Sequence, residues 1–129
     1  MHSVFMEGNE AIAWGAMASG CRFFAGYPIT PATTIYQTMI NILPPDGGIV
    51  MQGEDEIASI GLCMGAAMTG LKTLTATSGP GISLYSEQLS FAIGSEIPLG
   101  IKRRGFAVDI VMAHSARYQL EHRFLAVFE

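Results

Sequence analysis

Short apolar runs alternate with longer segments of helical periodicity along the first 99 residues. The apolar runs predict strands at residues 22–25, 49–52 and 72–76, and residues 96–98 lead toward a fourth strand. The segments between them predict helices over residues 9–20, 32–43, 54–69 and 82–93. Because strands alternate with helices, the strands should pair in parallel through right-handed crossovers. The pattern therefore predicts an α/β fold. Asn9 is the expected N-cap of the first helix.

Three loops leave the carboxyl ends of the predicted strands. They are GYPITP at 26–31, QGEDE at 52–56 and TSGPG at 77–81. In parallel sheets, ligands bind beyond this edge. The prolines stiffen the first loop and can hold Thr30 ready for a hydrogen bond to a ligand, although an ordinary tight turn explains the same residues. The glycines of the third loop allow close backbone approach, but SGPG is also typical of a plain turn.

The acidic residues Glu54, Asp55 and Glu56 lie together at a predicted helix start. Favourable interaction with the helix dipole is a sufficient explanation for such a cluster. Glu56, however, lies one turn before Ile60 on the apolar side of the helix, so it is the best candidate to face the sheet, while Asp55 faces water. A buried carboxylate is costly unless it is paired. An inward Glu56 would therefore indicate a ligand that donates a hydrogen bond.

Composition narrows the possible classes of protein. The 129 residues fit one domain, and a 50% apolar content excludes a disordered chain. The net charge of −4 argues against nucleic acid as a partner. The uncharged run at 57–71 is too short to span a membrane, and the start lacks the features of a signal peptide. Cys21 and Cys63 form no disulfide framework or metal motif, which indicates reduced thiols in a cytoplasmic protein.

Three stretches resemble the α subunit of 2-oxoacid:ferredoxin oxidoreductases, most closely the 2-oxoglutarate (KorA-like) type. They are GNEAIAWGAMASGCRFFAGYPITPATT, GEDEIASIGLCMGAAMTGLKTLTATSGPGISL and FAIGSEIPL, and they occur in the order and at the spacing of that family between residues 8 and 99. The resemblance implies the family's pyrimidine-binding domain for thiamine diphosphate. That domain is a three-layer parallel sheet with helices on both faces, which is expected to be incomplete at its C-terminus here.

The resemblance also implies roles for individual residues. The family decarboxylates a 2-oxo acid oxidatively, passes two electrons to ferredoxin and forms an acyl-CoA. Glu56 matches the glutamate that hydrogen-bonds the pyrimidine N1′, and Thr30 matches a threonine near substrate and cofactor; these two are the implied catalytic residues. The other implied cofactor-binding residues are Tyr27, Pro28, Ile29, Thr77, Ser78, Gly79, Pro80 and Gly81. A partner β subunit would hold Mg²⁺ and an Fe4S4 cluster, since such a cluster needs four cysteines and this chain has two.

The resemblance ends near Leu99, where the charge also changes. Residues 1–99 carry two basic and eight acidic side chains, whereas residues 100–129 carry five basic and three acidic ones. The sequence therefore predicts a pyrimidine-binding part at 1–99 and a divergent tail at 100–129, for which a change of reading frame is one hypothesis. The sheet is expected to lose its fourth strand, with 106–112 as a substitute strand and 115–128 as a helix. Arg103 and Arg104 lie near the family's substrate-binding arginine, but its motif is absent, so no role is transferred.

Two functions remain open at this stage. The chain contributes the pyrimidine side of an oxidoreductase site and is inactive alone, or it is a non-catalytic fragment or a nucleotide-binding or interaction module of the same fold. The glycine-containing loop suits both. Only the thiamine diphosphate hypothesis requires Glu56 and Thr30.

Overall fold

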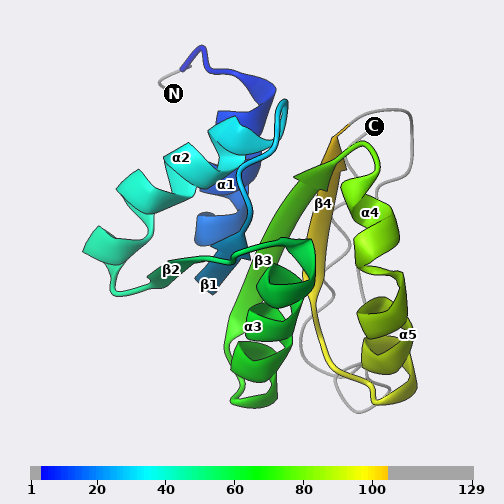
Figure 1. Cartoon of the computed structure of the whole chain (residues 1–129). Helices are drawn as coiled ribbons and strands as arrows, with labels where there is room; N and C mark the ends of the chain where they lie inside the picture. Colours follow the sequence, from blue (N-terminus) through cyan, green and yellow to red (C-terminus); the bar gives the residue numbers. More distant parts are fainter. Residues whose placement is uncertain (1–3, 105–129) are drawn as a thin grey trace.

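A computed structural model describes residues 4–104 and shows a four-stranded sheet with helices on both faces (Figure 1). The strands are β1 (Cys21–Gly26), β2 (Ile49–Gln52), β3 (Lys72–Ser78) and β4 (Gly100–Arg104). The helices are α1 (Gly8–Ala18), α2 (Thr33–Ile42), the short 3-10 helix η1 (Pro44–Asp46), α3 (Glu56–Met68), α4 (Gly81–Leu84) and α5 (Ser86–Gly94). All neighbouring strands are parallel, in the order β2-β1-β3-β4. The predicted α/β fold on a parallel sheet is confirmed.

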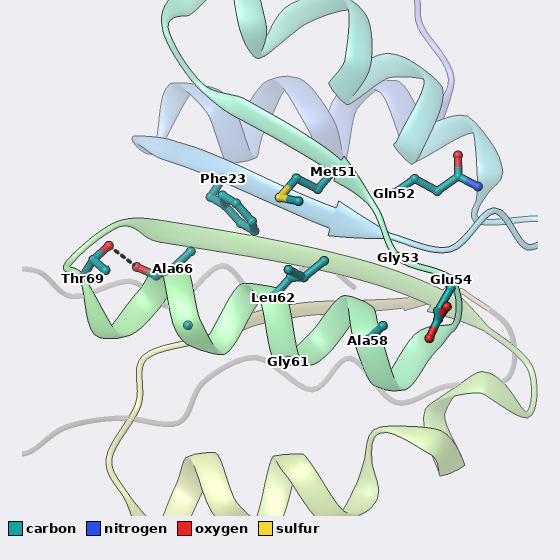
Figure 2. A pocket seen from close by; sticks show the side chains of 11 residues that line it. Phe23, Met51, Gln52, Gly53, Glu54, Ala58, Gly61, Leu62, Ala66 and Thr69 are labelled. Carbon is teal, nitrogen blue, oxygen red and sulfur yellow. Dashed lines mark hydrogen bonds between the residues drawn. The ribbon is translucent and has the colours of Figure 1, made fainter.

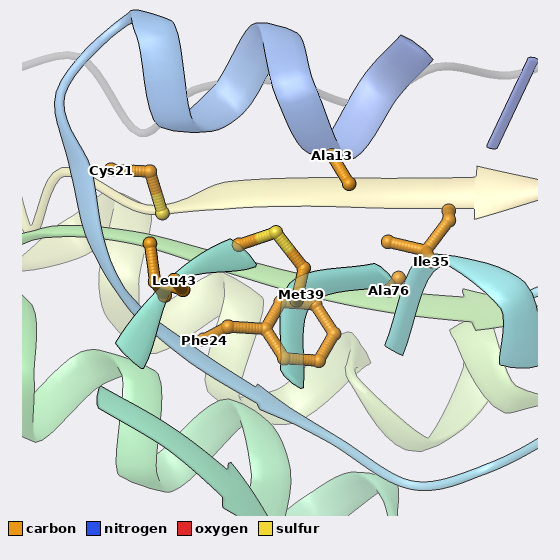
Figure 3. Packing of buried hydrophobic residues seen from close by; sticks show 7 residues of the cluster. All are labelled: Ala13, Cys21, Phe24, Ile35, Met39, Leu43 and Ala76. Atoms are coloured by element: carbon orange, nitrogen blue, oxygen red, sulfur yellow. The ribbon is translucent and has the colours of Figure 1, made fainter. Parts of the chain in front are cut away.

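The two faces of the sheet are covered by different helices because successive strand residues point to opposite sides. On one face, Phe24 and Ala76 pack under α1 and α2 (Figure 3). The buried cluster there consists of Ala13, Cys21, Phe24, Ile35, Met39, Leu43 and Ala76. On the other face, Phe23 and Ala25 pack against α3 and the Tyr85 side chain. Burial on both faces of β1 confirms the expected three layers.

Two predicted helix details are wrong. Asn9 is not the N-cap of α1, because the helix already begins at Gly8, with Glu7 as its N-cap. The Glu10 carboxylate accepts a 3.1 Å hydrogen bond from the Glu7 amide and so stabilises this earlier start. The predicted helix at 82–93 is divided at Tyr85 into α4 and α5.

The expected loss of the fourth strand is also wrong. Residues Gly100–Arg104 form β4, which pairs in parallel with β3 from Leu74 to Ser78. The flanking apolar side chains Leu99 and Ile101 are only 3% and 2% exposed, so this short strand contributes to the core. The substitute strand expected at 106–112 and the helix expected at 115–128 lie outside the described residues.

The carboxyl ends of the strands lie along one edge, as a parallel sheet requires. Gly26 pairs with Gln52, and Ser78 pairs with Arg104, at the ends of their strands. The Gly53 amide donates a 3.1 Å hydrogen bond to Gly26 O, which ties the first two loops together. Within the part of the chain that is described, no helix is long and apolar enough to cross a bilayer.

Candidate functional site

Glu56 lies at the first residue of α3, where the chain leaves the carboxyl edge of the sheet. The Asp55 side chain caps this helix by accepting a 2.7 Å hydrogen bond from the Ala58 amide. The cap orients the first turn so that Glu56 is only 6% exposed, whereas Glu54 is exposed. The predicted inward orientation of Glu56 is therefore confirmed. The positive end of α3 favours negative charge at this position.

The Glu56 carboxylate adjoins Thr77 and the start of α4. A Cβ atom built on Gly81 would lie 2.9 Å from Glu56 Oε1 and would overlap Thr77 Oγ1. Thr77 is fully buried, and its hydroxyl lies near the Tyr85 hydroxyl but makes no hydrogen bond of ordinary geometry among residues 4–104. Among residues 4–104, no side chain pairs with the Glu56 carboxylate either. The carboxylate of a largely buried residue and a buried hydroxyl thus lie side by side, without an ordinary hydrogen bond to another side chain among residues 4–104, and a polar ligand could satisfy both.

Tyr85 supports this arrangement from the core and was not found by sequence analysis. Its hydroxyl is fully buried and shares a 2.9 Å hydrogen bond with Thr75 Oγ1. Burial raises the pKa of Tyr85 above its ordinary value of 10.0, and the nearby Glu56 carboxylate raises it further. An aromatic residue inside a predicted helix is typical of a core position, so the sequence offered no indication of this polar contact.

The proline loop at 27–32 is fixed by side chains from two other elements. Ser78 Oγ donates a 2.9 Å hydrogen bond to Thr30 O, and Asn9 Nδ2 donates a 2.8 Å hydrogen bond to Pro31 O. The Thr30 side chain itself is exposed. The remaining predicted residues of the loop are the exposed Tyr27 and the half-buried Pro28 and Ile29. The structure thus joins the first and third loops through Ser78.

The third loop makes a tight connection between β3 and α4. Thr77 and Ser78, predicted in a turn, are instead the last residues of β3. Gly79 has a φ of +54°, a conformation that favours glycine, and Pro80 is exposed. Gly81 is buried against Thr77 and Glu56. The short turn therefore returns the chain directly over the Glu56 carboxylate.

An open groove of about 850 Å³ runs along the other flank of α3, beside the edge strand β2 (Figure 2). Its lining is mainly apolar and consists of Phe23, Met51, Gln52, Gly53, Glu54, Ala58, Gly61, Leu62, Gly65, Ala66 and Thr69. Neither Glu56 nor Thr77 lines it. The groove and the buried carboxylate are therefore separate features of the same helix.

The two cysteines are core residues. Both thiols are free and buried, and burial raises the pKa of Cys21 to about 11 and that of Cys63 to about 12. Neither is a reactive thiolate near neutral pH. No group of three or more His, Cys, Asp or Glu side chains within residues 4–104 is arranged to hold a metal ion.

Comparison with known proteins identifies the family. The sequence model of the family described as "Pyruvate flavodoxin/ferredoxin oxidoreductase, thiamine diP-bdg" matches residues 14–115. The chain belongs to this family. The suspected relationship to 2-oxoacid:ferredoxin oxidoreductases and the thiamine diphosphate-binding fold are thereby confirmed.

Several similar proteins are 2-oxoglutarate synthase subunits, and others, at 43–44% identity, are ketoisovalerate oxidoreductase subunits. The chain is 53% identical over 97 residues to the 2-oxoglutarate synthase subunit KorA of Methanothermobacter marburgensis, covering 75% of this chain and 26% of that subunit. It is 43% identical over 127 residues to KorA of Archaeoglobus fulgidus, covering 96% of this chain and 37% of that subunit. The chain thus spans about a quarter to just over a third of the length of these relatives.

A solved member of the family has the same fold. The structure of the 2-oxoglutarate:ferredoxin oxidoreductase from Magnetococcus marinus, with 2-oxoglutarate, coenzyme A and succinyl-CoA bound, matches with a TM-score of 0.77 and 45% identity. The match covers 81% of this chain and 19% of that one. The family model and the Archaeoglobus relative both extend past Leu99. The boundary of the divergent tail stays a prediction.

Proposed function

We propose that this chain supplies the pyrimidine-binding side of the thiamine diphosphate site in a 2-oxoglutarate:ferredoxin oxidoreductase. The observation that supports this proposal is the largely buried Glu56 carboxylate, which has no side-chain partner among residues 4–104 and lies beside the buried Thr77 hydroxyl. In its imino tautomer the aminopyrimidine ring offers an N1′–H donor that complements the carboxylate, so Glu56 and Thr77 fit the cofactor. The Methanothermobacter and Archaeoglobus relatives are both 2-oxoglutarate synthase subunits, which supports the choice of substrate.

In this proposal each residue of the site has its own role in binding the cofactor or the substrate. Glu56 would accept a hydrogen bond from the N1′–H that the pyrimidine carries in its imino tautomer, and the negative charge of the carboxylate makes such a bond strong in a site from which water is excluded. Thr77 offers its hydroxyl to the same ring, and Thr30 borders the space for substrate. Thiamine diphosphate, when bound, supplies the nucleophilic carbon and the electron sink that decarboxylation of a 2-oxo acid requires. Gly81, at the start of α4, packs against Glu56 and Thr77, and Gly79 and Pro80 form the turn that leads to it. The proposal assigns Tyr27, Pro28 and Ile29 to the proline-loop side of the site.

The remaining parts of the reaction belong, in this proposal, to partners. A β subunit would hold the diphosphate, Mg²⁺ and an Fe4S4 cluster, with ferredoxin and coenzyme A acting through the complex. The cysteine content supports this division, since two cysteines cannot supply the four thiolates of the cluster. The free Cys21 and Cys63 thiols favour a reducing, cytoplasmic location.

The test compares two glutamates at the same helix start. The full chain is co-expressed with its β subunit, and 2-oxoglutarate-dependent dye reduction is measured for wild type, Glu56→Gln and Glu54→Gln. We expect Glu56→Gln to lose about 10²-fold or more in turnover while the complex still assembles. The exposed Glu54 is the matched control and should leave turnover unchanged.

The outcome also separates the two functions left open by the sequence. An interaction or nucleotide-binding module has no use for the carboxylate of Glu56. Full turnover of Glu56→Gln would therefore remove Glu56 from the mechanism. A complex that assembles but shows no 2-oxoglutarate-dependent turnover even as wild type would favour the non-catalytic alternative.

A further inference from the structure

Two buried side chains bind consecutive carbonyl groups of the proline loop. Asn9 Nδ2, in the first turn of α1, donates to Pro31 O at 2.8 Å, and Ser78 Oγ, at the end of β3, donates to Thr30 O at 2.9 Å. Asn9 is 1% exposed and Ser78 is 2% exposed. These contacts bridge 22 and 48 residues of sequence, so they come from two elements that are distant from the loop along the chain.

The loop lacks the means to fix itself. It lies outside every helix and strand, and its two prolines carry no N–H group with which to bond neighbouring carbonyls. Bonds from rigid elements are therefore the available way to hold its backbone. Asn9 is itself fixed within α1, and Nδ2 also contacts Thr34 Oγ1 at the start of α2.

Ser78 connects the loop to the buried carboxylate. It follows Thr77 directly in β3, and Thr77 lies beside Glu56 across Gly81. A hydrogen bond from Ser78 to Thr30 O thus gives Thr30 a fixed position relative to Glu56. The Ser78 hydroxyl is already engaged in this bond and is almost completely buried.

We propose that Asn9 and Ser78 are positioning residues that lock the proline loop and hold Thr30 in register with Glu56 before the cofactor binds. This inference rests on the proposed function. It assigns Ser78 a bond within the protein instead of a contact with thiamine diphosphate, and it gives a role to Asn9, which sequence analysis had interpreted as a helix cap.

The first measurement is made without cofactor. Backbone NMR order parameters of Tyr27, Ile29 and Thr30 are compared in the full chain for wild type, Asn9→Ala and Ser78→Ala. We expect values of about 0.85 in wild type and below about 0.6 in both variants. Ser90→Ala is the matched control, because Ser90 Oγ also donates a 2.9 Å bond to a carbonyl, but within α5. Ser78→Thr keeps the hydroxyl and should restore the rigid loop.

The second measurement is the dissociation constant of thiamine diphosphate with Mg²⁺ in the assembled complex. We expect it to rise about tenfold in Asn9→Ala and Ser78→Ala, since the loop must then be ordered on binding. Ser90→Ala and Ser78→Thr should bind as wild type does. If Asn9→Ala fails to fold, the Ser78→Ala and Ser78→Thr pair decides alone.

The outcomes distinguish this inference from the proposed function. Unchanged order parameters in the variants would overturn the inference, and so would a loosened loop with unchanged cofactor affinity. Either result leaves the role of Glu56 intact, because wild type still binds the cofactor. A wild-type complex that binds no thiamine diphosphate would overturn the proposed function, and the inference with it.

Discussion

Replacing Gly81 by alanine tests the close packing above Glu56. Alanine normally stabilises a helix relative to glycine by about 0.5–1 kcal/mol. At Gly81, however, the new Cβ would overlap Thr77 Oγ1 and lie 2.9 Å from Glu56 Oε1, a separation that real Cβ atoms essentially never show. Overpacking of this kind costs about 1–3 kcal/mol. We therefore expect Gly81→Ala to lower the free energy of unfolding by about that amount in urea titrations followed by circular dichroism.

Two further variants test whether the loss of stability in Gly81→Ala comes from the overlap with Thr77. Gly15 lies in the middle of α1 with open space around its Cα, so Gly15→Ala should raise the free energy of unfolding by about 0.5–1 kcal/mol. Thr77→Ala removes the overlapping oxygen and leaves the Thr77 Cβ at 3.3 Å. In that background, Gly81→Ala should be milder by at least about 0.5 kcal/mol. A shift of the urea midpoint in the same direction for Gly81→Ala and Gly15→Ala would refute the packing around Glu56.

Three other predictions concern the groups around the site. Asp55→Ala removes the α3 cap and should lower the free energy of unfolding by about 1 kcal/mol in urea titrations; no change would argue against the cap. Tyr85→Phe leaves the Thr75 hydroxyl buried without its partner and should cost about 1–3 kcal/mol in the same assay, whereas a neutral effect would contradict that hydrogen bond. The folded-state pKa values of Cys21 and Cys63 lie above their ordinary 9.0, so the folded chain retains protons that the unfolded chain releases. The contribution of the thiols to stability should therefore be full below pH 9 and fall above it, up to about pH 11 for Cys21 and about pH 12 for Cys63, by up to about 1.4 kcal/mol per pH unit for each thiol. The double variant Cys21→Ala/Cys63→Ala should reduce this slope. If the double variant lost stability with pH as steeply as wild type, the two thiols would not be the groups responsible for the pH dependence.

The sequence predicted what depends on local periodicity and missed what depends on distant partners. The inward orientation of Glu56 follows from its place one helical turn before Ile60, and the structure confirms it. Asn9 is different, because its polar side chain at a helix start suggests a cap, and only the folded chain brings it to Pro31. Tyr85 is a second example, because its hydroxyl shares a hydrogen bond with Thr75 on β3. The helical pattern around Tyr85 contains no information about that strand.

The fourth strand was missed for another physical reason. The change in charge after Leu99 suggested that the family pattern had ended, but a strand at a sheet edge needs only a few residues in register. Leu99 and Ile101 supply the apolar side chains, and five residues of backbone pair with β3. A marked change of composition therefore does not by itself mark the end of a sheet.

The site combines loops that are held by hydrogen bonds with one carboxylate in an unfavourable, largely buried position. The Gly53 amide donates to Gly26 O and Ser78 Oγ donates to Thr30 O, so hydrogen bonds within the protein link the carboxyl ends of β1 and β3 and the loops that follow the strands. Within this frame, Glu56 is largely buried and has no side-chain partner in the described part of the chain, whereas buried charges are ordinarily paired. Proteins tolerate such violations mainly at functional sites, because the rest of the fold compensates for their cost. The hydrogen-bonded edge and the carboxylate without a side-chain partner among residues 4–104 therefore support one another as indications of a binding site. A rigid edge alone would indicate only a stable sheet, and a carboxylate on a mobile loop would turn toward water.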